Sequence, residues 1–181
     1  MKKILIVNIC KEKLHYYEFV KPIEEILRIN GFNYFIRNYE DIKNNDLRKC
    51  SKIIICGTSL FDNYFIKDIK TFKWLLGFEK PVLGICGGMQ IIGLIFGGKL
   101  KKKKEIGFYN ENFIKNFLGF FGEKEVYHLH NYYVGFNNMT DFEVFSESKV
   151  SQAVKHKSKN IYGVLFHPEV RNVEVIINFV K

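Results

Sequence analysis

Apolar runs of strand length alternate with amphipathic segments through the first half of the chain, and this alternation constrains the possible fold more than any other feature. The apolar runs cover residues 2–9, 32–37, 51–57 and 81–85. Residues 19–31 and 63–77 carry apolar side chains at helical spacing between such runs. A helix between two strands returns the chain to the same end of the sheet. The order therefore predicts a parallel sheet with helices on both faces.

The second half of the chain has a different pattern. Four segments alternate in the manner of antiparallel strands: 125–136, 142–148, 151–157 and 160–167. A short helix is expected over 173–180. We therefore predict an α/β fold with a flavodoxin-like central parallel sheet flanked by helices, and an additional antiparallel strand region in the C-terminal half. The chain has 181 residues and 47% hydrophobic side chains, enough for one packed core, so residues 1–181 are expected to form a single domain.

The charge balance invites a nucleic-acid interpretation that nothing else in the sequence supports. The formal net charge is +9, and Lys101 to Lys104 form a basic run. Such a run is usually a solvated loop, and no nucleic-acid recognition motif accompanies it. No apolar stretch is long enough to span a bilayer. We expect a cytoplasmic protein that binds neither nucleic acid nor membranes, in which Cys10, Cys50 and Cys56 remain reduced thiols.

A glycine-rich turn follows the fourth predicted strand and contains the remaining cysteine, Cys86, in the sequence GICGGMQ. In parallel α/β sheets, ligands bind beyond the carboxyl ends of the strands, which is where this turn lies. A nucleophile on a tight strand-to-helix turn needs small neighbours, and Gly84, Gly87 and Gly88 provide them. The N-terminus of the following helix favours the thiolate. A structural turn with a buried cysteine would have the same local sequence, so a catalytic base is needed to decide.

The sequence His167-Pro168-Glu169 supplies that base at the end of the last predicted strand. His167 can take the thiol proton and return it to a leaving group, while Glu169 can orient the imidazole and stabilise its charged form. A strand end with a chance HPE sequence is the alternative. This chance interpretation is weaker than the catalytic one, because both motifs occur in this order in one small α/β chain.

Both motifs resemble those of the class I glutamine amidotransferases. GICGGMQ resembles the nucleophile turn of that family, and IYGVLFHPEV resembles the segment that carries its histidine and glutamate. The resemblance extends over nearly the whole chain. It implies that Cys86, His167 and Glu169 form a catalytic triad, and that Cys86 attacks the carboxamide of glutamine to give a thioester. This chemistry requires no cofactor.

The resemblance also implies groups that bind the substrate and the developing oxyanion. The oxyanion donors would be the amide of Gly87 and the turn at Gly57 and Thr58. Here the chain departs from the family, in which a Gly-Gly-Pro turn is usual, because Gly57-Thr58-Ser59 places a β-branched residue in the turn. Gln90 matches a glutamine that helps to hold the substrate, and His130 matches a histidine beside the glutamine pocket. Tyr132 is also expected to bind the substrate, although GMP synthetase subunits usually have an acidic residue at its position.

Other polar residues are given ordinary structural roles. His128 and His130 share one face of a predicted strand, but a metal site is not expected because no cysteine or carboxylate partner lies near them in the sequence. Asp62 is interpreted as the N-cap of the helix that follows it. His15 and His156 are interpreted as surface residues.

The sequence contains no phosphate loop of the GxxxxGK type and no second domain for ATP. A separate ATP-dependent synthetase subunit is therefore expected to accept the ammonia. Residues 153–170 resemble the separate glutaminase subunit of archaeal GMP synthetase, the acceptor we favour, whereas HNYYV is nearer to the glutaminase subunit of imidazole glycerol phosphate synthase. Another amidotransferase, a stand-alone γ-glutamyl hydrolase and a catalytically silent homologue remain as alternatives.

Overall fold

A seven-stranded sheet forms the centre of the molecule in the computed structural model, which describes residues 3–181. Its strand order is β2-β1-β3-β4-β9-β8-β7, and the first five strands are parallel. The strands are β1 (Lys3–Asn8), β2 (Tyr34–Asn38), β3 (Cys50–Ile55), β4 (Val82–Ile85), β7 (Phe142–Val144), β8 (Ala153–His156) and β9 (Ile161–Val164). The predicted fold class is confirmed. One detail differs, because β9 pairs in parallel with β4 and is antiparallel only to β8.

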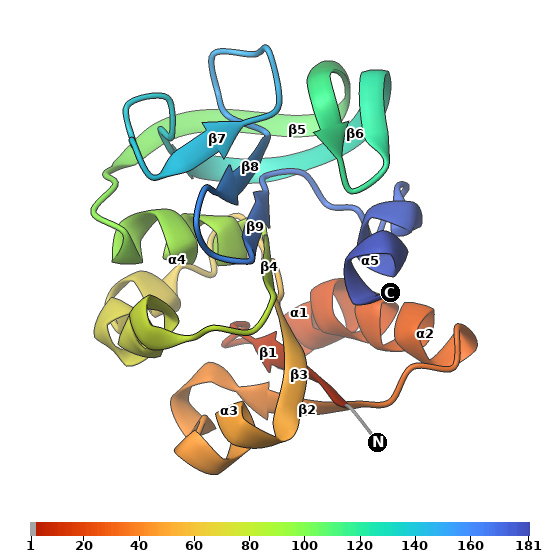
Figure 1. Cartoon of the computed structure of the whole chain (residues 1–181), viewed down its shortest axis with the longest axis vertical. Helices are drawn as coiled ribbons and strands as arrows, with labels where there is room; N and C mark the ends of the chain where they lie inside the picture. Colours follow the sequence, from red (N-terminus) through yellow and green to blue (C-terminus); the bar gives the residue numbers. More distant parts are fainter. Residues whose placement is uncertain (1–2) are drawn as a thin grey trace.

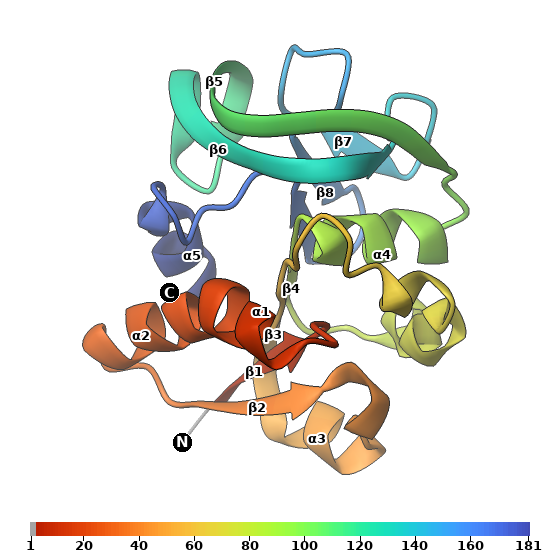
Figure 2. The same cartoon turned by 180° about the vertical axis from the view of Figure 1, so that it is seen from behind.

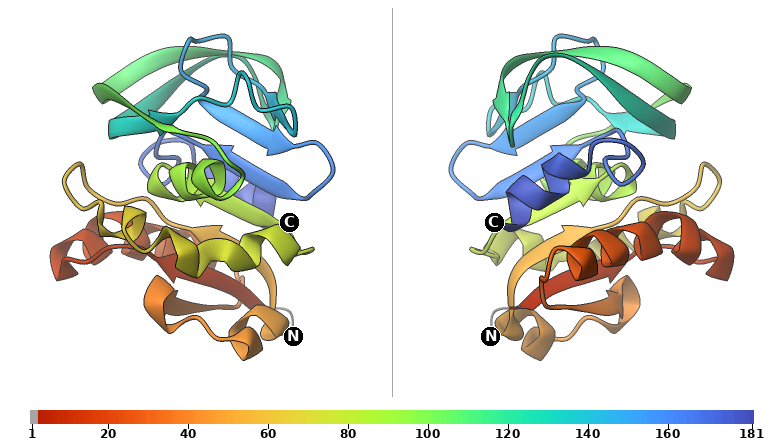
Figure 3. Two further views of the ribbon diagram at one scale, coloured as in Figure 1. Left: turned by 90° about the vertical axis from the view of Figure 1, so that its left-hand side faces the viewer. Right: turned by 90° about the vertical axis from the view of Figure 1, so that its right-hand side faces the viewer.

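Helices cover both faces of this sheet, and the layers are seen from the side in Figure 3. On one face lie α2 (Lys21–Ile29) and α5 (Val173–Val180), which contact each other. On the other lie α4 (Gly87–Ile95) and the 3₁₀ segment η4 (Ile69–Gly77). No helix in the described part of the chain is long and apolar enough to cross a membrane.

Several helical segments differ from the prediction. The helix predicted over 19–31 starts earlier in the chain than expected. It begins at α1 (Lys13–His15) and passes through a π-helical turn, η1 (Tyr16–Val20), before α2 (Figure 2). The predicted helix over 63–77 is instead two 3₁₀ pieces, η3 (Tyr64–Ile66) and η4. The sequence pattern also missed α3 (Asn44–Lys49) and η2 (Tyr39–Asp41). Both are short and mostly polar, so they carry little helical periodicity.

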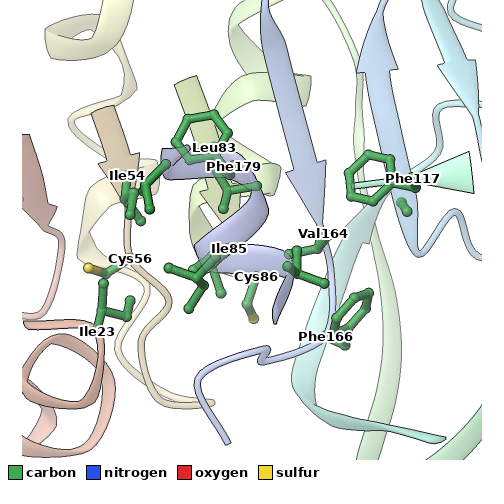
Figure 4. Close-up of a cluster of buried hydrophobic side chains, with 14 of the residues drawn as sticks. Ile23, Ile54, Cys56, Leu83, Ile85, Cys86, Phe117, Val164, Phe166 and Phe179 are labelled. Atoms are coloured by element: carbon green, nitrogen blue, oxygen red, sulfur yellow. The ribbon is translucent and has the colours of Figure 1, made fainter. Parts of the chain in front are cut away.

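Alternate side chains of the central strands fill two hydrophobic cores, one on each face of the sheet. Ile54 and Leu83 pack with α2 and α5, whereas Ile53 and Ile55 pack with α4 and η4. This follows from the two-residue period of a strand whose faces are both covered. Figure 4 shows the first core, with Cys86 at its margin beside Ile85.

A long two-stranded hairpin lies across the molecule above β7 to β9, as Figure 1 shows. It consists of β5 (Leu100–Phe117) and β6 (Phe120–Val134). The expectation that Lys101 to Lys104 form a loop is wrong, since these exposed lysines belong to β5. The turn is Leu118-Gly119, with φ of 49° and 91°, as a two-residue hairpin turn with left-handed central residues requires. Phe113, Phe117 and Phe120 anchor the far end in the core.

Candidate active site

Cys86 occupies a strained turn between β4 and α4. Its φ of 47° and ψ of −102° are unfavourable for a residue with a side chain. Its amide donates to the carbonyl of Val164 at 2.8 Å, and its carbonyl accepts from Gln90 at 3.0 Å. A Cβ on Gly84 would lie 2.5 Å from the carbonyl carbon of Gly88, and one on Gly88 would lie 2.3 Å from the Ile55 carbonyl oxygen. The flanking glycines therefore permit backbones to touch where the turn forms.

His167 and Glu169 follow β9 and lie next to this turn. His167 Nδ1 is 2.7 Å from Glu169 Oε1, and both side chains are almost fully buried. The His167 amide donates to the carbonyl of Tyr127 at 2.9 Å, which fixes the backbone. Burial by itself lowers the pKa of His167, but the Glu169 carboxylate and Cys86 raise it well above the ordinary histidine value. Nε2 is buried and has no hydrogen-bond partner among residues 3–181, so this nitrogen remains available for the thiol.

The Gly57-Thr58 turn closes the other side of the cysteine. A Cβ on Gly57 would lie 2.6 Å from Cε1 of His167 and 3.4 Å from Cβ of Cys86, so only glycine fits between this turn and the imidazole. Thr58 Oγ1 donates to Asp62 Oδ2 at 3.0 Å. Among described non-glycine residues only Cys86 and Leu118 have positive φ, so Thr58 keeps an ordinary backbone conformation here.

A small pocket opens beside Cys86. Its lining comes from the loop after β3, the start of α4 and the middle of β6, and includes Thr58, Gly87, Gln90, His130 and Tyr132. The pocket thus brings together most of the residues that the resemblance implied. The amide of Gln90 donates from Nε2 to the Tyr132 carbonyl at 2.8 Å, while its buried Oε1 lacks a partner among the described residues. That oxygen can accept a hydrogen bond from a ligand.

The comparisons with known proteins agree with this geometry. Residues 15–175 match the sequence model described as glutamine amidotransferase class-I. The chain belongs to the class I glutamine amidotransferase family. The resemblance found from the two sequence motifs is therefore confirmed.

Two relatives indicate the branch of the family that the chain resembles. It is 35% identical to one of the subunits of the glutamine-hydrolysing GMP synthase of Methanosphaera stadtmanae over 120 residues, 59% of this chain and 63% of that protein. It is 36% identical to a glutamine-hydrolysing GMP synthase of Staphylococcus saprophyticus over 111 residues, 56% of this chain and 21% of that protein. The matched segments span less than two thirds of either relative.

Two solved structures share the fold. A protein of Thermoplasma acidophilum, named provisionally as one of the subunits of a GMP synthase, superposes with a TM-score of 0.86 at 24% identity, covering 99% of this chain and 92% of that one. A glutamine amidotransferase of Thermotoga maritima gives 0.73 at 18% identity, covering 99% and 80%. At these sequence identities the likeness to the two solved structures establishes the fold alone.

The structure overturns the reason given for excluding a metal. Glu105 is 25 residues distant from His130 in the sequence, yet the hairpin register pairs the two directly. Glu105 Oε2 lies 3.0 Å from His130 Nε2 and 3.4 Å from His128 Nδ1. The histidines therefore do have a carboxylate partner. The sequence analysis missed this carboxylate because β5 was not recognised as a strand. Once β5 is paired with β6, the register of the hairpin places Glu105 opposite His130.

His130 borders the pocket, but its two ring nitrogens face the neighbouring strand. Nδ1 lies 3.2 Å from the carbonyl of Lys103, and Nε2 faces Glu105. A direct hydrogen bond from His130 to substrate would break one of these contacts. Leu129, which precedes it, was not among the predicted residues; its carbonyl accepts from Cys86 Sγ at 3.6 Å.

Two structural interpretations from the sequence are wrong, those of Asp62 and His156. Asp62 is not a helix N-cap: η3 is capped by Asn63, and the buried Asp62 Oδ2 accepts from the Lys11 amide at 2.9 Å and from Thr58. His15 is partly exposed, and its Nδ1 lies 2.8 Å from the same Asp62 oxygen. His156 is buried, with Phe96 and Phe142 against its ring.

The other three cysteines lie in environments that hold them as thiols. Burial raises the pKa of Cys10 to about 12 and also raises the pKa of Cys50. Burial is also the main reason why the pKa of the fully buried Cys56 lies well above the ordinary cysteine value. All four cysteines are free, and the expectation of reduced thiols is consistent with this. Chemical reactivity at neutral pH should therefore be confined to Cys86.

Proposed function

We propose that this chain is a glutaminase subunit, which hydrolyses glutamine through a thioester on Cys86 and delivers the ammonia to a separate ATP-dependent synthetase. The observation that carries the proposal is the strained Cys86 backbone at the start of α4, beside the buried His167–Glu169 pair. Strained backbone persists where the surroundings impose it, and such positions concentrate at functional sites. The family to which the chain belongs supports the same reaction class.

The proposed reaction assigns one task to each residue. Cys86 Sγ attacks the side-chain carboxamide carbon of glutamine while His167 takes the thiol proton. The C–N bond breaks as His167 returns this proton to the leaving nitrogen, which departs as ammonia and leaves the thioester. Water, deprotonated by His167, cleaves the thioester to glutamate and restores the thiol. Glu169 orients the imidazole and stabilises its charged form.

The remaining residues would bind the substrate and its oxyanion. The amide of Gly87, directly after the nucleophile, and the Gly57-Thr58 turn would donate to the negative oxygen of the tetrahedral intermediate. The unpartnered Oε1 of Gln90 would accept from the substrate. Tyr132 lines the same pocket and would limit its size.

The acceptor is proposed to be a GMP-synthetase-like subunit. The relatives named above support this choice over imidazole glycerol phosphate synthase, which only the short HNYYV sequence favours. The pocket beside Cys86 is small, with a cavity volume of about 10 Å³ that holds roughly one water molecule, so glutamine requires the lining to move.

Exposed apolar side chains beside the pocket mouth offer a surface for that partner. Phe61, which lies between the pocket-lining residues Leu60 and Asn63, is 88% exposed, and Tyr64 is also exposed. Single exposed apolar residues are common, but here they belong to the loop that forms the oxyanion turn. A synthetase that covered this loop could position it at the same time.

A glutamine analogue bearing a diazo-ketone tests the nucleophile. We expect one covalent adduct per chain, located on Cys86 by mass spectrometry, and no adduct or glutaminase activity in Cys86→Ala. Cys10→Ala is a matched control, because Cys10 also contacts the Gly57 carbonyl, at 3.6 Å, yet should leave labelling unchanged. An adduct on another cysteine, or unchanged hydrolysis by Cys86→Ala, would contradict the proposal. A pull-down with the synthetase, combined with glutaminase assays, then tests the acceptor.

A further inference from the structure

Four buried polar atoms on the hairpin have no hydrogen-bond partner in the described part of the chain. They are Glu105 Oε2, His130 Nε2 and both ring nitrogens of His128. His128 is fully buried, His130 is 2% exposed and Glu105 is 8% exposed. Buried polar groups in proteins are nearly always satisfied, and exceptions often mark an ion or a water that belongs at the site.

Three of these atoms converge on one point. Glu105 Oε2 is 3.0 Å from His130 Nε2 and 3.4 Å from His128 Nδ1, and each of the three side chains offers one ligand atom within 4.8 Å of the other two. Two ligands of a tetrahedral zinc ion, each at about 2.1 Å, are separated by about 3.4 Å. Two imidazoles and one carboxylate are a ligand set that suits zinc and related divalent transition metals.

The outer nitrogens of the two histidines face oxygen atoms of the kind that usually orient metal-bound imidazoles. A histidine that binds a metal through one nitrogen commonly donates through the other to a carboxylate or carbonyl. His130 Nδ1 lies 3.2 Å from the Lys103 carbonyl oxygen, and His128 Nε2 lies 3.6 Å from Glu111 Oε1. The second oxygen of Glu105 is paired with Lys103 Nζ at 2.6 Å, which leaves Oε2 directed at the histidines.

We propose that Glu105, His128 and His130 form a binding site for one divalent metal ion of the zinc class, with Glu111 and the Lys103 carbonyl orienting the two imidazoles. The ion joins β5 to β6 and leaves one coordination position for water. Its effect on the catalytic centre is structural, because Leu129 lies between the two histidines and its carbonyl faces the Cys86 sulfur. The ion fixes this segment of β6 without contacting glutamine.

Zinc titration of the purified chain tests the site separately from glutaminase activity. The background is Cys86→Ser, which removes the catalytic sulfur as a competing ligand. Competition with a chromophoric chelator should show one Zn²⁺ per chain. Glu105→Gln, His128→Gln and His130→Gln should each weaken binding at least a hundredfold, and Glu111→Gln by about tenfold. His156→Gln, which replaces a buried histidine outside the cluster, should bind zinc as the background does.

X-ray absorption of the zinc complex provides a second measurement that does not depend on the folding of the variants. We expect nitrogen and oxygen neighbours with two imidazoles, and no sulfur, in the chain that retains Cys86. Absence of stoichiometric binding would overturn the proposal and leave an ion-paired cluster of Lys103, Glu105 and the histidines. Sulfur coordination, or binding that is lost only with Cys86→Ser, would overturn it by placing the ion at the catalytic cysteine.

Discussion

At the scale of single residues, a few contacts decide how the cysteine and the histidine meet. Gly57 leaves room for the imidazole, and Glu169 holds that ring at Nδ1. The Glu169 carboxylate raises the pKa of His167 against the opposite effect of burial, and so favours the charged ring that His167 would become on taking the thiol proton. The interaction of the charged ring with Glu169 stabilises the folded chain at low pH. This contribution to the free energy of unfolding is lost as the pH rises through the raised pKa of His167.

Glu169→Gln should therefore lower the pKa of His167, since it removes a carboxylate that favours the charged ring. Histidine NMR titration should show His167 losing its proton at a lower pH than in the unsubstituted chain. Measurable glutaminase activity should remain in this variant, whereas His167→Ala should lose nearly all, because an orienting group contributes less than the base. Equal losses in two folded variants, or an unchanged titration, would be evidence against these roles.

At the scale of secondary structure, the turn from β4 into α4 depends on contacts between backbones. Gly88 lies against the end of β3 so closely that any side chain there would overlap the Ile55 carbonyl. This contact sets the distance between α4 and the sheet, and with it the position of Cys86 at the first turn of the helix. The same reasoning explains why the GICGGMQ segment contains so many glycines.

Gly88→Ala should destabilise the protein by about 1–3 kcal/mol, the usual effect of overpacking a tight interior contact. Urea unfolding monitored by circular dichroism would measure this change. Gly77→Ala is the matched control: Gly77 is exposed at the end of η4, a Cβ there would meet nothing within 4 Å, and the expected change is close to zero. Equal stability of the Gly88 variant and this control would disprove the close-contact argument.

At the scale of the whole molecule, the loop after β3 links the Gly57-Thr58 turn to distant parts of the chain. Thr58 is hydrogen-bonded to Asp62, which also accepts a hydrogen bond from the amide of Lys11 after β1. Asn131 of β6 donates a hydrogen bond to the Leu60 carbonyl at 3.0 Å. These contacts stabilise the observed conformation of the loop. A partner that binds only a conformation in which the oxyanion donors are aligned would shift the population towards it.

The isolated chain is accordingly expected to be a poor glutaminase until its synthetase is added. If one misplaced oxyanion donor costs about 3 kcal/mol, the resting rate falls on the order of a hundredfold. Thr58→Gly should raise the rate of the lone chain and narrow the gap to the complex. Thr58→Ser keeps a hydroxyl for Asp62 and so separates the effect of the β-branch from that of the hydrogen bond. A lone chain whose rate no partner improves would contradict this gating.

The sequence by itself determined the parallel sheet, its flanking helices and the two motifs that place Cys86, His167 and Glu169. Each depends on local information: strand and helix periodicity, glycines in a tight turn, and short spacings along the chain. Only the tertiary structure decided that Glu105 meets His128 and His130, that Asp62 anchors the Gly57-Thr58 turn, and that the lysine run belongs to a strand. Those outcomes depend on the register of a long hairpin and on loops brought together by the sheet. Such non-local pairings leave no period in the sequence, because the partner of each residue is chosen by the packing of the whole chain.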